Sequence, residues 1–255
     1  MDFGLNGCVA IITGGARGIG LAHARALGAE GVRIALTDID AAAAEAAAEG
    51  LRADGIAATA LPGDAADTQT VSDCVARVLA VEGRIDILVN NAGIGIDPAH
   101  PVAEMPPEAW DRMIHVHMRS TFLWSRAVIA PMRAGGFGRI VSTSSMNFTG
   151  GGRVGVAHYA AAKAGIVGMT QTLAKEVGRD GITANAVAPG YVATGLIAGF
   201  DDATRALLCT QNPVGRLCRP DEVAAAVTFL CSVQAGFING ECLCIDGGRR
   251  DFFWG

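Results

Sequence analysis

The sequence has few charged residues, and they do not form the basic clusters that bind anionic partners. Only 18% of the 255 residues are charged, the formal net charge is -5, and no run of Lys or Arg suggests a binding patch. Proteins that bind nucleic acid or an anionic lipid surface carry such concentrated positive charge. The composition therefore argues against nucleic acid and against a membrane surface as the main partner.

Long apolar runs and paired-cysteine motifs are also missing. No apolar run reaches the roughly 18 residues of a membrane span, and the charged start of a signal peptide is absent before the first basic residue, Arg17. The seven cysteines include no C-x-x-C pair, which fits a reducing cytoplasm. Cys242 and Cys244 share one face of a predicted strand but lack further ligands, so we expect packing there and no metal site.

Short apolar, β-branched runs alternate with helical patterns along the chain. With 51% hydrophobic residues and 34 glycines, the chain can fill a large core and make many turns. The clearest helical spacing covers 68–82, 107–133 and 157–178. Seven candidate strands lie between the helical stretches, at residues 8–15, 33–40, 58–64, 84–93, 139–145, 182–190 and 241–248.

This alternation predicts an α/β fold: a Rossmann-type doubly wound sheet of seven mostly parallel strands, with helices on both faces. No Pro/Ser-rich linker divides the chain, so we expect residues 1–255 to form a single dinucleotide-binding and catalytic domain. Residues 194–215 have weak periodicity, which predicts a substrate loop.

A glycine-rich turn, "TGGARGIG" at 13–20, follows the first predicted strand and opens the first helix. Glycines at 14, 18 and 20 let the backbone turn tightly and approach a pyrophosphate, whose charge then meets the N–H groups of the helix N-terminus. Arg17 and Ile19 belong to the same turn. The alternative is a tight strand-to-helix connection without a ligand.

Asp38 ends the second predicted strand, eighteen residues after Gly20. A carboxylate there accepts both ribose hydroxyls of an adenosine and repels a 2′-phosphate, which favours NAD over NADP. Two observations leave alternatives open. Asp38 could instead cap the helix that begins near Asp40, and the guanidinium of Arg17 could receive a 2′-phosphate.

Tyr159 and Lys163 stand four residues apart in "YAAAK", so a helix brings both to one face. A phenol with a pKa of about 10 is a poor base at neutral pH. An ammonium group about 4 Å away favours the phenolate by about 4 kcal/mol, or nearly three pKa units before desolvation is subtracted. The pair therefore predicts a general acid/base, although such a pair also arises by chance on exposed helices.

Four motifs in register resemble the short-chain dehydrogenase/reductase family. They are "TGGARGIG", "NNAG" at 90–93, "YAAAK" at 159–163 and "APGYVAT" at 188–194. The resemblance covers nearly the whole chain, in the order of the family and at about its spacing. It implies a nicotinamide cofactor, with Lys163 holding the nicotinamide ribose.

The resemblance also implies further site residues. A serine at the end of the fifth strand would hold the substrate oxygen: Ser145 matches, with Ser144 as the rival because the segment up to Tyr159 is one residue longer than usual. The implied cofactor contacts beyond the glycine turn, Asp38, Tyr159 and Lys163 are Asp64, Ala65, Asn91, Ala92, Gly93, Pro189, Gly190, Val192 and Thr194.

His117 departs from the family pattern. The family usually has an asparagine at this position, which helps to hold a water beside the lysine in a proton relay. An imidazole both donates and accepts hydrogen bonds, so His117 could continue such a relay. It could equally be a neutral core histidine bonded to a backbone carbonyl.

The expected substrate pocket is mostly apolar, and its lining includes Met146, Phe148, Leu196, Ile197 and Phe200. Arg153 is a candidate polar contact. The exposed aromatic ending "DFFWG" would be costly in a monomer, so we expect it to pack on a neighbouring subunit. The tetramers usual in the resembled family agree with this expectation.

These observations together predict an NAD-dependent oxidoreductase that moves hydride between the cofactor and a secondary alcohol or ketone. Tyr159, Lys163 and Ser145 would carry the chemistry, with His117 as an uncertain relay. One alternative is an NADP-dependent carbonyl reductase of the 3-oxoacyl type, and another is a protein that senses dinucleotide without turnover.

Overall fold

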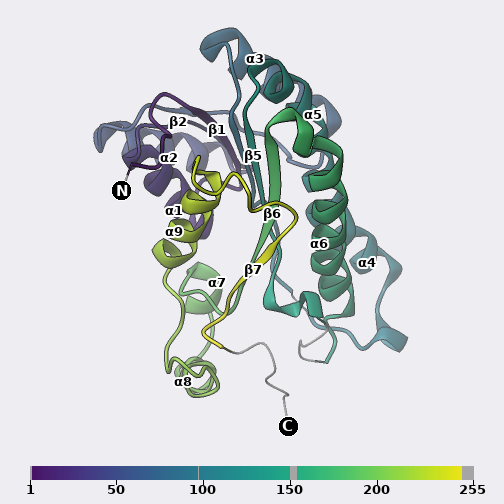
Figure 1. The fold of residues 1–255 in the computed structure, drawn as a ribbon. Helices are drawn as coiled ribbons and strands as arrows, with labels where there is room; N and C mark the ends of the chain where they lie inside the picture. The colour runs from purple at the N-terminus through teal and green to yellow at the C-terminus, as the bar shows by residue number, and fades with distance from the viewer. Residues whose placement is uncertain (1, 97, 150–153, 249–255) are drawn as a thin grey trace.

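The computed structural model describes residues 2–96, 98–149 and 154–248 (Figure 1). Its centre is one sheet of seven parallel strands in the order β3-β2-β1-β4-β5-β6-β7. The strands are β1 (Val9–Thr13), β2 (Arg33–Thr37), β3 (Ala58–Ala60), β4 (Ile87–Asn90), β5 (Gly138–Thr143), β6 (Ile182–Pro189) and β7 (Cys242–Ile245). Six lie within segments that the sequence predicts as strands and β5 begins one residue before its predicted segment, so the predicted sheet is confirmed.

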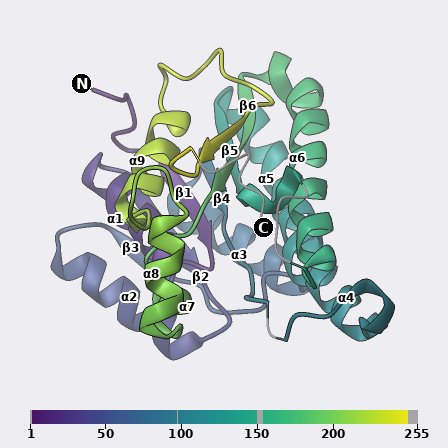
Figure 2. The same ribbon diagram turned by 90° about the horizontal axis from the view of Figure 1, so that it is seen from below.

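The helices cover both faces of the sheet, as Figures 1 and 2 show. Alternate strand residues point to opposite faces: Ala10 and Ile12 pack with α1, α2 and α9, whereas Val9 and Ile11 pack with α3, α5 and α6. The helices are α1 (Gly18–Ala29), α2 (Ala41–Ala53), α3 (Thr68–Glu82), α4 (Pro107–Ile114), α5 (Ser120–Gly135), α6 (Ala157–Val177), α7 (Gly195–Ala198), α8 (Asp202–Thr210) and α9 (Pro220–Cys231).

Strand order reverses at β1, which lies between β2 and β4. The chain leaves β1 in one direction and later returns to the other side of it, so the loops after β1 and β4 diverge at the carboxyl ends of these strands. In open α/β sheets, ligands bind in the crevice at this switch point. The glycine-rich turn follows β1 and "NNAG" begins at the end of β4, so the topology brings the two motifs together.

The predicted helix at 107–133 is interrupted. A π-helical segment, His115–Arg119, separates α4 from α5. Side-chain hydroxyls bond backbone carbonyls of this segment: Ser120 Oγ donates to Val116 O over 2.6 Å, and Thr121 Oγ1 donates to His117 O over 2.8 Å. Because one such turn shifts the apolar periodicity only slightly, the sequence pattern did not indicate it.

Residues 194–215 contain α7 and α8, which lie beyond the carboxyl ends of the strands, at the bottom of Figure 1. The predicted substrate loop therefore contains two short helices. The aromatic ending and Arg153 lie outside the described residues. Among the helices that the structure describes, none has the length and apolar character to cross a membrane.

His23 is a fully buried histidine on α1, the helix that packs against α9. Neither of its ring nitrogens has a hydrogen-bond partner within the described parts of the chain. Because burial penalises the charged imidazole, the pKa of His23 falls from 6.5 to about 3.

Replacing His23 with Leu is expected to reduce the fall in the free energy of unfolding as the pH drops below about 6.5. The folded protein keeps His23 neutral down to about pH 3, whereas the unfolded chain protonates it below pH 6.5. Through this residue the free energy of unfolding falls by about 1.4 kcal/mol per pH unit as the pH drops below that value. Urea unfolding of both proteins between about pH 7.5 and pH 4.5 measures the slope. An unchanged slope in the variant would contradict the prediction.

Candidate functional site

The sequence-predicted site residues converge on the carboxyl ends of the strands. The glycine turn, Asp38 and Asp64 follow β1, β2 and β3, and Asn91 and Ser145 follow β4 and β5. Residues 190–194 follow β6, α6 contributes Tyr159 and Lys163, and the π-helical segment contributes His117. Parallel strands end at the same edge of a sheet, so residues far apart in sequence line one site.

Glycine is required in the turn after β1 because other backbone comes so close. Gly14 has φ +61°, and a Cβ on it would lie 2.9 Å from Ala92 Cα. A Cβ on Gly20 would lie 2.0 Å from Gly14 O. The next helix, α1, has neither a side-chain cap nor an acidic residue in its first turn. The turn therefore presents helix N–H groups in a cradle that fits a pyrophosphate.

Thr13 and Asn91 lock this turn to the loop after β4. Thr13 Oγ1 accepts hydrogen bonds from Asn91 N at 2.9 Å and from Ala92 N at 3.0 Å. The Asn91 side chain donates to Gly14 O at 3.0 Å. Asn91, expected beneath a cofactor, thus uses its side chain to hold the glycine turn. Thr13 was not identified from the sequence as a residue that holds the turn. Its position directly before the glycines was the only signal of this role.

Asp38 lies half-buried at the end of β2 and is bonded to backbone on two sides. Its carboxylate accepts hydrogen bonds from Ala16 N and from Asp40 N, both at 3.2 Å. Asp40, and not Asp38, caps α2 by accepting a bond from Ala43 N at 3.0 Å. Arg17 Nη2 forms an ion pair with Asp40 Oδ2 at 2.6 Å. The Asp38 carboxylate, at this corner between the glycine turn and the loop after β2, can accept hydrogen bonds from the hydroxyls of an adenosine ribose.

The loop that contains Asp64 and Ala65 is bonded by side chains of α5 and of the π-helical segment. Asp64 Oδ1 accepts a bond from Ala66 N at 2.8 Å. Trp124 Nε1 donates to Ala65 O and Arg119 Nε donates to Ala66 O, each at 3.1 Å. No sequence motif pointed to Trp124 or Arg119, because their contacts span more than fifty residues.

The two serines after β5 point to different partners. Ser144 Oγ donates to the carbonyl of Lys163 at 2.8 Å, so it joins the sheet to the backbone of α6. The Ser145 side chain forms a hydrogen bond with Tyr159. Lys163 is buried and its Nζ donates to Thr143 O at 2.7 Å, 5.6 Å from the centre of the Tyr159 ring. Ser145, Tyr159 and Lys163 therefore form one cluster, and Ser144 faces away from it.

Burial sets the pKa values of this cluster. It raises the pKa of Tyr159 above 10, while the hydrogen bond from Ser145 opposes the increase. It also lowers the pKa of Lys163 from 10.5 to about 7. From the sequence we expected the charge of Lys163 to lower the pKa of Tyr159. In the structure desolvation outweighs that attraction, because both groups have lost water, and the phenol is protonated at neutral pH.

His117 has the geometry of a neutral imidazole bonded to the backbone. Its Nε2 lies 3.1 Å from Ile94 O and 3.2 Å from Ile94 N. Burial and the nearby Lys163 hold the pKa of His117 well below 6.5. The ring meets Tyr159 edge to face, with centroids 5.4 Å apart, and a Cβ on Gly93 would lie 2.5 Å from its Cε1. The imidazole thus fills the space between the loop after β4 and the phenol.

The segment after β6 closes the site from the other side. Gly190 packs against Asp246, where a Cβ would lie 3.1 Å from the Asp246 Cα. Val192 is buried and pairs with Cys218 in an isolated bridge. A Cβ on Gly18 would lie 3.5 Å from the methyl carbon of Thr194. This segment therefore reaches back to the glycine turn.

Part of the expected substrate lining can be described. The side chains of Met146 and Ile197 are buried, and those of Phe148 and Phe200 are partly buried. The side chain of Leu196 lies outside what the structure describes. Across the described chain, no three His, Cys, Asp or Glu side chains gather as they would around a metal ion.

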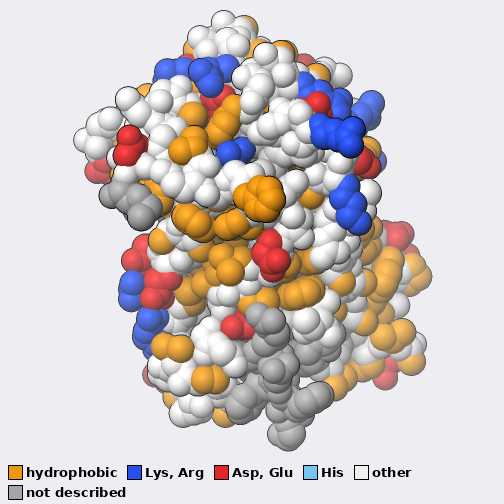
Figure 3. Space-filling view, viewed as in Figure 1, with side chains coloured by type: hydrophobic (Ala, Val, Ile, Leu, Met, Phe, Trp, Pro, Cys, Tyr) orange, Lys and Arg blue, Asp and Glu red, His pale blue; other side chains and the backbone are white. Residues whose placement is uncertain are grey.

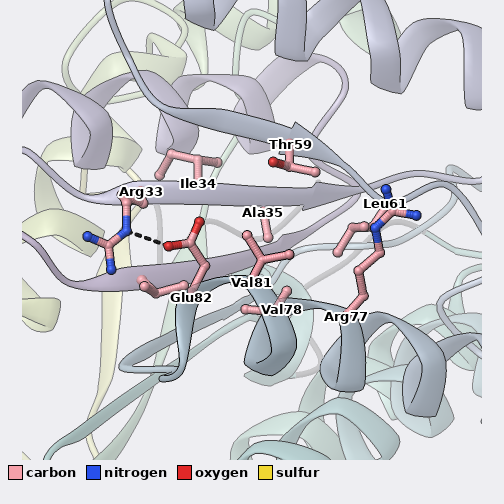
Figure 4. Close-up of a pocket in the computed structure, with 10 residues that line it drawn as sticks. Arg33, Ile34, Ala35, Thr59, Leu61, Arg77, Val78, Val81 and Glu82 are labelled. Carbon is pink, nitrogen blue, oxygen red and sulfur yellow. Dashed lines mark ion pairs between the residues drawn. The ribbon is translucent and has the colours of Figure 1, made fainter.

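A separate cavity of about 190 Å³ lies away from these residues, between β1, β2, β3 and α3 (Figure 4). Apolar side chains such as Ala35 and Val78 form its walls, and the ion pair of Arg33 with Glu82 stands at one end, 2.7 Å long. None of the sequence-predicted site residues lines it.

Comparisons with known proteins agree with this arrangement. A family model described as Enoyl-(Acyl carrier protein) reductase matches residues 14–250. Cis-4-hydroxycyclohexanecarboxylate dehydrogenase of Sinomonas cyclohexanicum is 40% identical over 94% of this chain and 95% of its own. The 3-oxoacyl-acyl-carrier-protein reductase FabG of Escherichia coli is 39% identical over 95% of this chain and 97% of its own.

A solved structure shares the fold of the chain over nearly its full length. A provisionally assigned gluconate dehydrogenase from Agrobacterium tumefaciens superposes with a TM-score of 0.93 at 31% identity, covering 99% of this chain and 100% of that one. Since the family model and the relatives match almost the full length, the chain belongs to the short-chain dehydrogenase/reductase family and is an oxidoreductase that uses a nicotinamide dinucleotide.

Proposed function

We propose that the protein is an NAD-dependent alcohol dehydrogenase/ketone reductase that acts on a secondary alcohol or ketone. The observation that carries the proposal is the cluster in which the buried Ser145 bonds the partly buried Tyr159, one helical turn from the buried Lys163. Such a cluster can hold one substrate oxygen and exchange one proton with it.

The chain's own residues would bind the dinucleotide, which when bound supplies the hydride acceptor or donor. The pyrophosphate would lie on the glycine turn at Gly14, Gly18, Ile19 and Gly20. The proposed adenosine contacts are Asp38 at the ribose and Asp64 with Ala65 at the base. The proposed contacts of the nicotinamide half are Asn91, Ala92, Gly93, Tyr159, Lys163, Pro189, Gly190, Val192 and Thr194.

Tyr159 would act as general acid in reduction and as general base in oxidation. In reduction its phenol donates the O–H proton to the substrate oxygen as hydride reaches the carbon, and in oxidation the proton returns. Ser145 would donate a hydrogen bond to the same oxygen and hold it in place. Lys163, whose pKa of about 7 lies near neutrality, would stabilise the phenolate and bind the ribose.

We propose a supporting role for His117. Its neutral imidazole would position Tyr159 and the Ile94 loop, as its two contacts suggest. A stepwise proton transfer through His117 would pass through an imidazolium, and the lowered pKa of His117 disfavours that form. His117 would therefore be a positioning residue.

Two relatives bear on the substrate. One is named for a hydroxycyclohexane carboxylate and another, acetoacetyl-CoA reductase of Shinella zoogloeoides, for a 3-oxoacyl thioester. The first compound carries a secondary alcohol and the second a ketone. The apolar side chains of Met146, Phe148, Ile197 and Phe200 favour a mostly apolar substrate for this chain. An NADP-dependent 3-oxoacyl-type reductase is the second candidate, supported by the likeness to FabG.

We also propose a cytoplasmic homotetramer. The seven cysteines form no disulfide, in keeping with a reducing compartment. Apolar side chains gather on the face that carries β7 (Figure 3). Exposed apolar side chains include Phe229 on α9, Leu243 on β7 and Phe237 in the segment between these two elements. Exposed apolar area of this kind supports packing against a second copy of the chain.

The Tyr159→Phe variant tests the proposed function. With NAD⁺ and a panel of cyclic, aromatic and aliphatic secondary alcohols, we expect wild-type turnover and a loss of about 10²- to 10⁴-fold in kcat/KM in the variant. NADH binding, followed by fluorescence, should be retained because the ring remains. Parallel assays with NADP⁺ separate the two candidates. A variant as active as wild type would contradict the proposed acid/base role.

A pair of serine variants tests which hydroxyl holds the substrate oxygen. Ser145→Ala should lower kcat/KM by about 10²-fold, the typical effect of losing one donor to a reacting oxygen. Ser144→Ala is the matched control, which should leave turnover nearly intact and lower the free energy of unfolding by about 1 kcal/mol. Steady-state rates and urea unfolding distinguish them, and the reverse order of effects on turnover would overturn the assignment.

His117 variants test positioning against relay. His117→Leu removes the bond to Ile94 and should lower kcat about tenfold, within the range for a misplaced reacting group. His117→Asn, which keeps hydrogen-bonding groups, should recover most of the loss. Between about pH 6 and pH 9 the Asn variant should retain the wild-type pH profile. Loss of one limb of that profile in the Asn variant would favour a relay instead.

A further inference from the structure

Arg17 brings a positive charge to the adenosine end of the site, and Asp40 binds it. The two side chains form an ion pair, Nη2 to Oδ2, of 2.6 Å. Arg17 precedes the first residue of α1, and Asp40 precedes the first residue of α2. The ion pair therefore bridges the glycine turn and the loop after β2, beside the carboxylate of Asp38.

Asp40 is held in this position by bonds that do not involve Arg17. Its Oδ1 accepts from Ala43 N at 3.0 Å and so caps α2, and its own N–H donates to Asp38 Oδ1 at 3.2 Å. The Ala43 amide and the Arg17 guanidinium hold the pKa of Asp40 below its ordinary value. Asp40 therefore stays charged and cannot turn away from Arg17 without uncapping the helix.

The ion pair changes what Arg17 can do for a cofactor. A guanidinium binds phosphate through its N–H groups, and a 2′-phosphate on the adenosine ribose would enter this corner. Asp38 repels that phosphate. Asp40 competes with it for Arg17, because its carboxylate already engages the Nη2 group and offsets the guanidinium charge. The three side chains together leave the corner with one net negative charge.

We propose that Asp40 is a second specificity-determining residue, which withholds Arg17 from a 2′-phosphate and so reinforces the preference of Asp38 for NAD. This inference rests on the proposed function and deepens its cofactor choice. Asp38 acts by repulsion of the phosphate, whereas Asp40 acts by occupying the cation that would otherwise bind it.

The test measures cofactor binding without turnover. Asp40→Asn removes the charge and keeps a side chain that can cap α2, so thermal unfolding should change little. Fluorescence titration should show NADPH binding about fivefold tighter than in wild type, in the range of one exposed ion pair. NADH affinity should be unchanged, since Asp38 is intact. The gain in NADPH affinity should shrink as salt is raised.

Arg17→Ala completes a double-mutant cycle. Alone it should leave NADPH affinity near the wild-type value, because the pair already withholds Arg17. In the Asp40→Asn background it should remove most of the gain. An equal gain with and without Arg17, or no gain at all, would overturn the inference while normal NADH binding upheld the proposed function. Failure of wild type to bind NADH would overturn both.

Discussion

The close approach of two backbone turns at the carboxyl ends of β1 and β4 underlies the rest of the site. Gly14 lies so near Ala92 that no side chain fits between them, and Thr13 Oγ1 bonds the amides of Asn91 and Ala92. This contact gives the first turn of α1 its place relative to the centre of the sheet. The proposed pyrophosphate cradle and the proposed floor of the nicotinamide pocket therefore share one support.

The π-helical segment connects the two ends of the site. Arg119 reaches the loop after β3 at Ala66, and His117 reaches Ile94 and the ring of Tyr159. The hydroxyls of Ser120 and Thr121 bond two carbonyls of the segment, so side chains as well as backbone hold the irregular turn. A regular helix would rotate these two side chains relative to one another, and π turns are frequent at functional sites.

Local patterns predicted the sheet, because strand and helix periodicities differ and each glycine turn follows a buried run. They also brought Tyr159 and Lys163 together, since four residues make about one turn of helix. The sequence could not show that Ser144 faces away from the cluster, that Asp40 binds Arg17, or that burial raises the pKa of Tyr159. Each of these depends on packing between segments that are distant in the chain or on water excluded by the whole fold.

The hydroxyl of Ser144 bonds the backbone carbonyl of Lys163, which ties the end of β5 to α6 at the lysine itself. The proposed acid/base pair is therefore anchored to the sheet at its own helix. Of the expected substrate lining, Met146 directly follows Ser145 in a segment that packs against α6, whereas Ile197 lies on α7, beyond the end of β6. Because one fold can host many specificities, changes confined to the α7 segment would alter the substrate contacts while leaving this anchor in place.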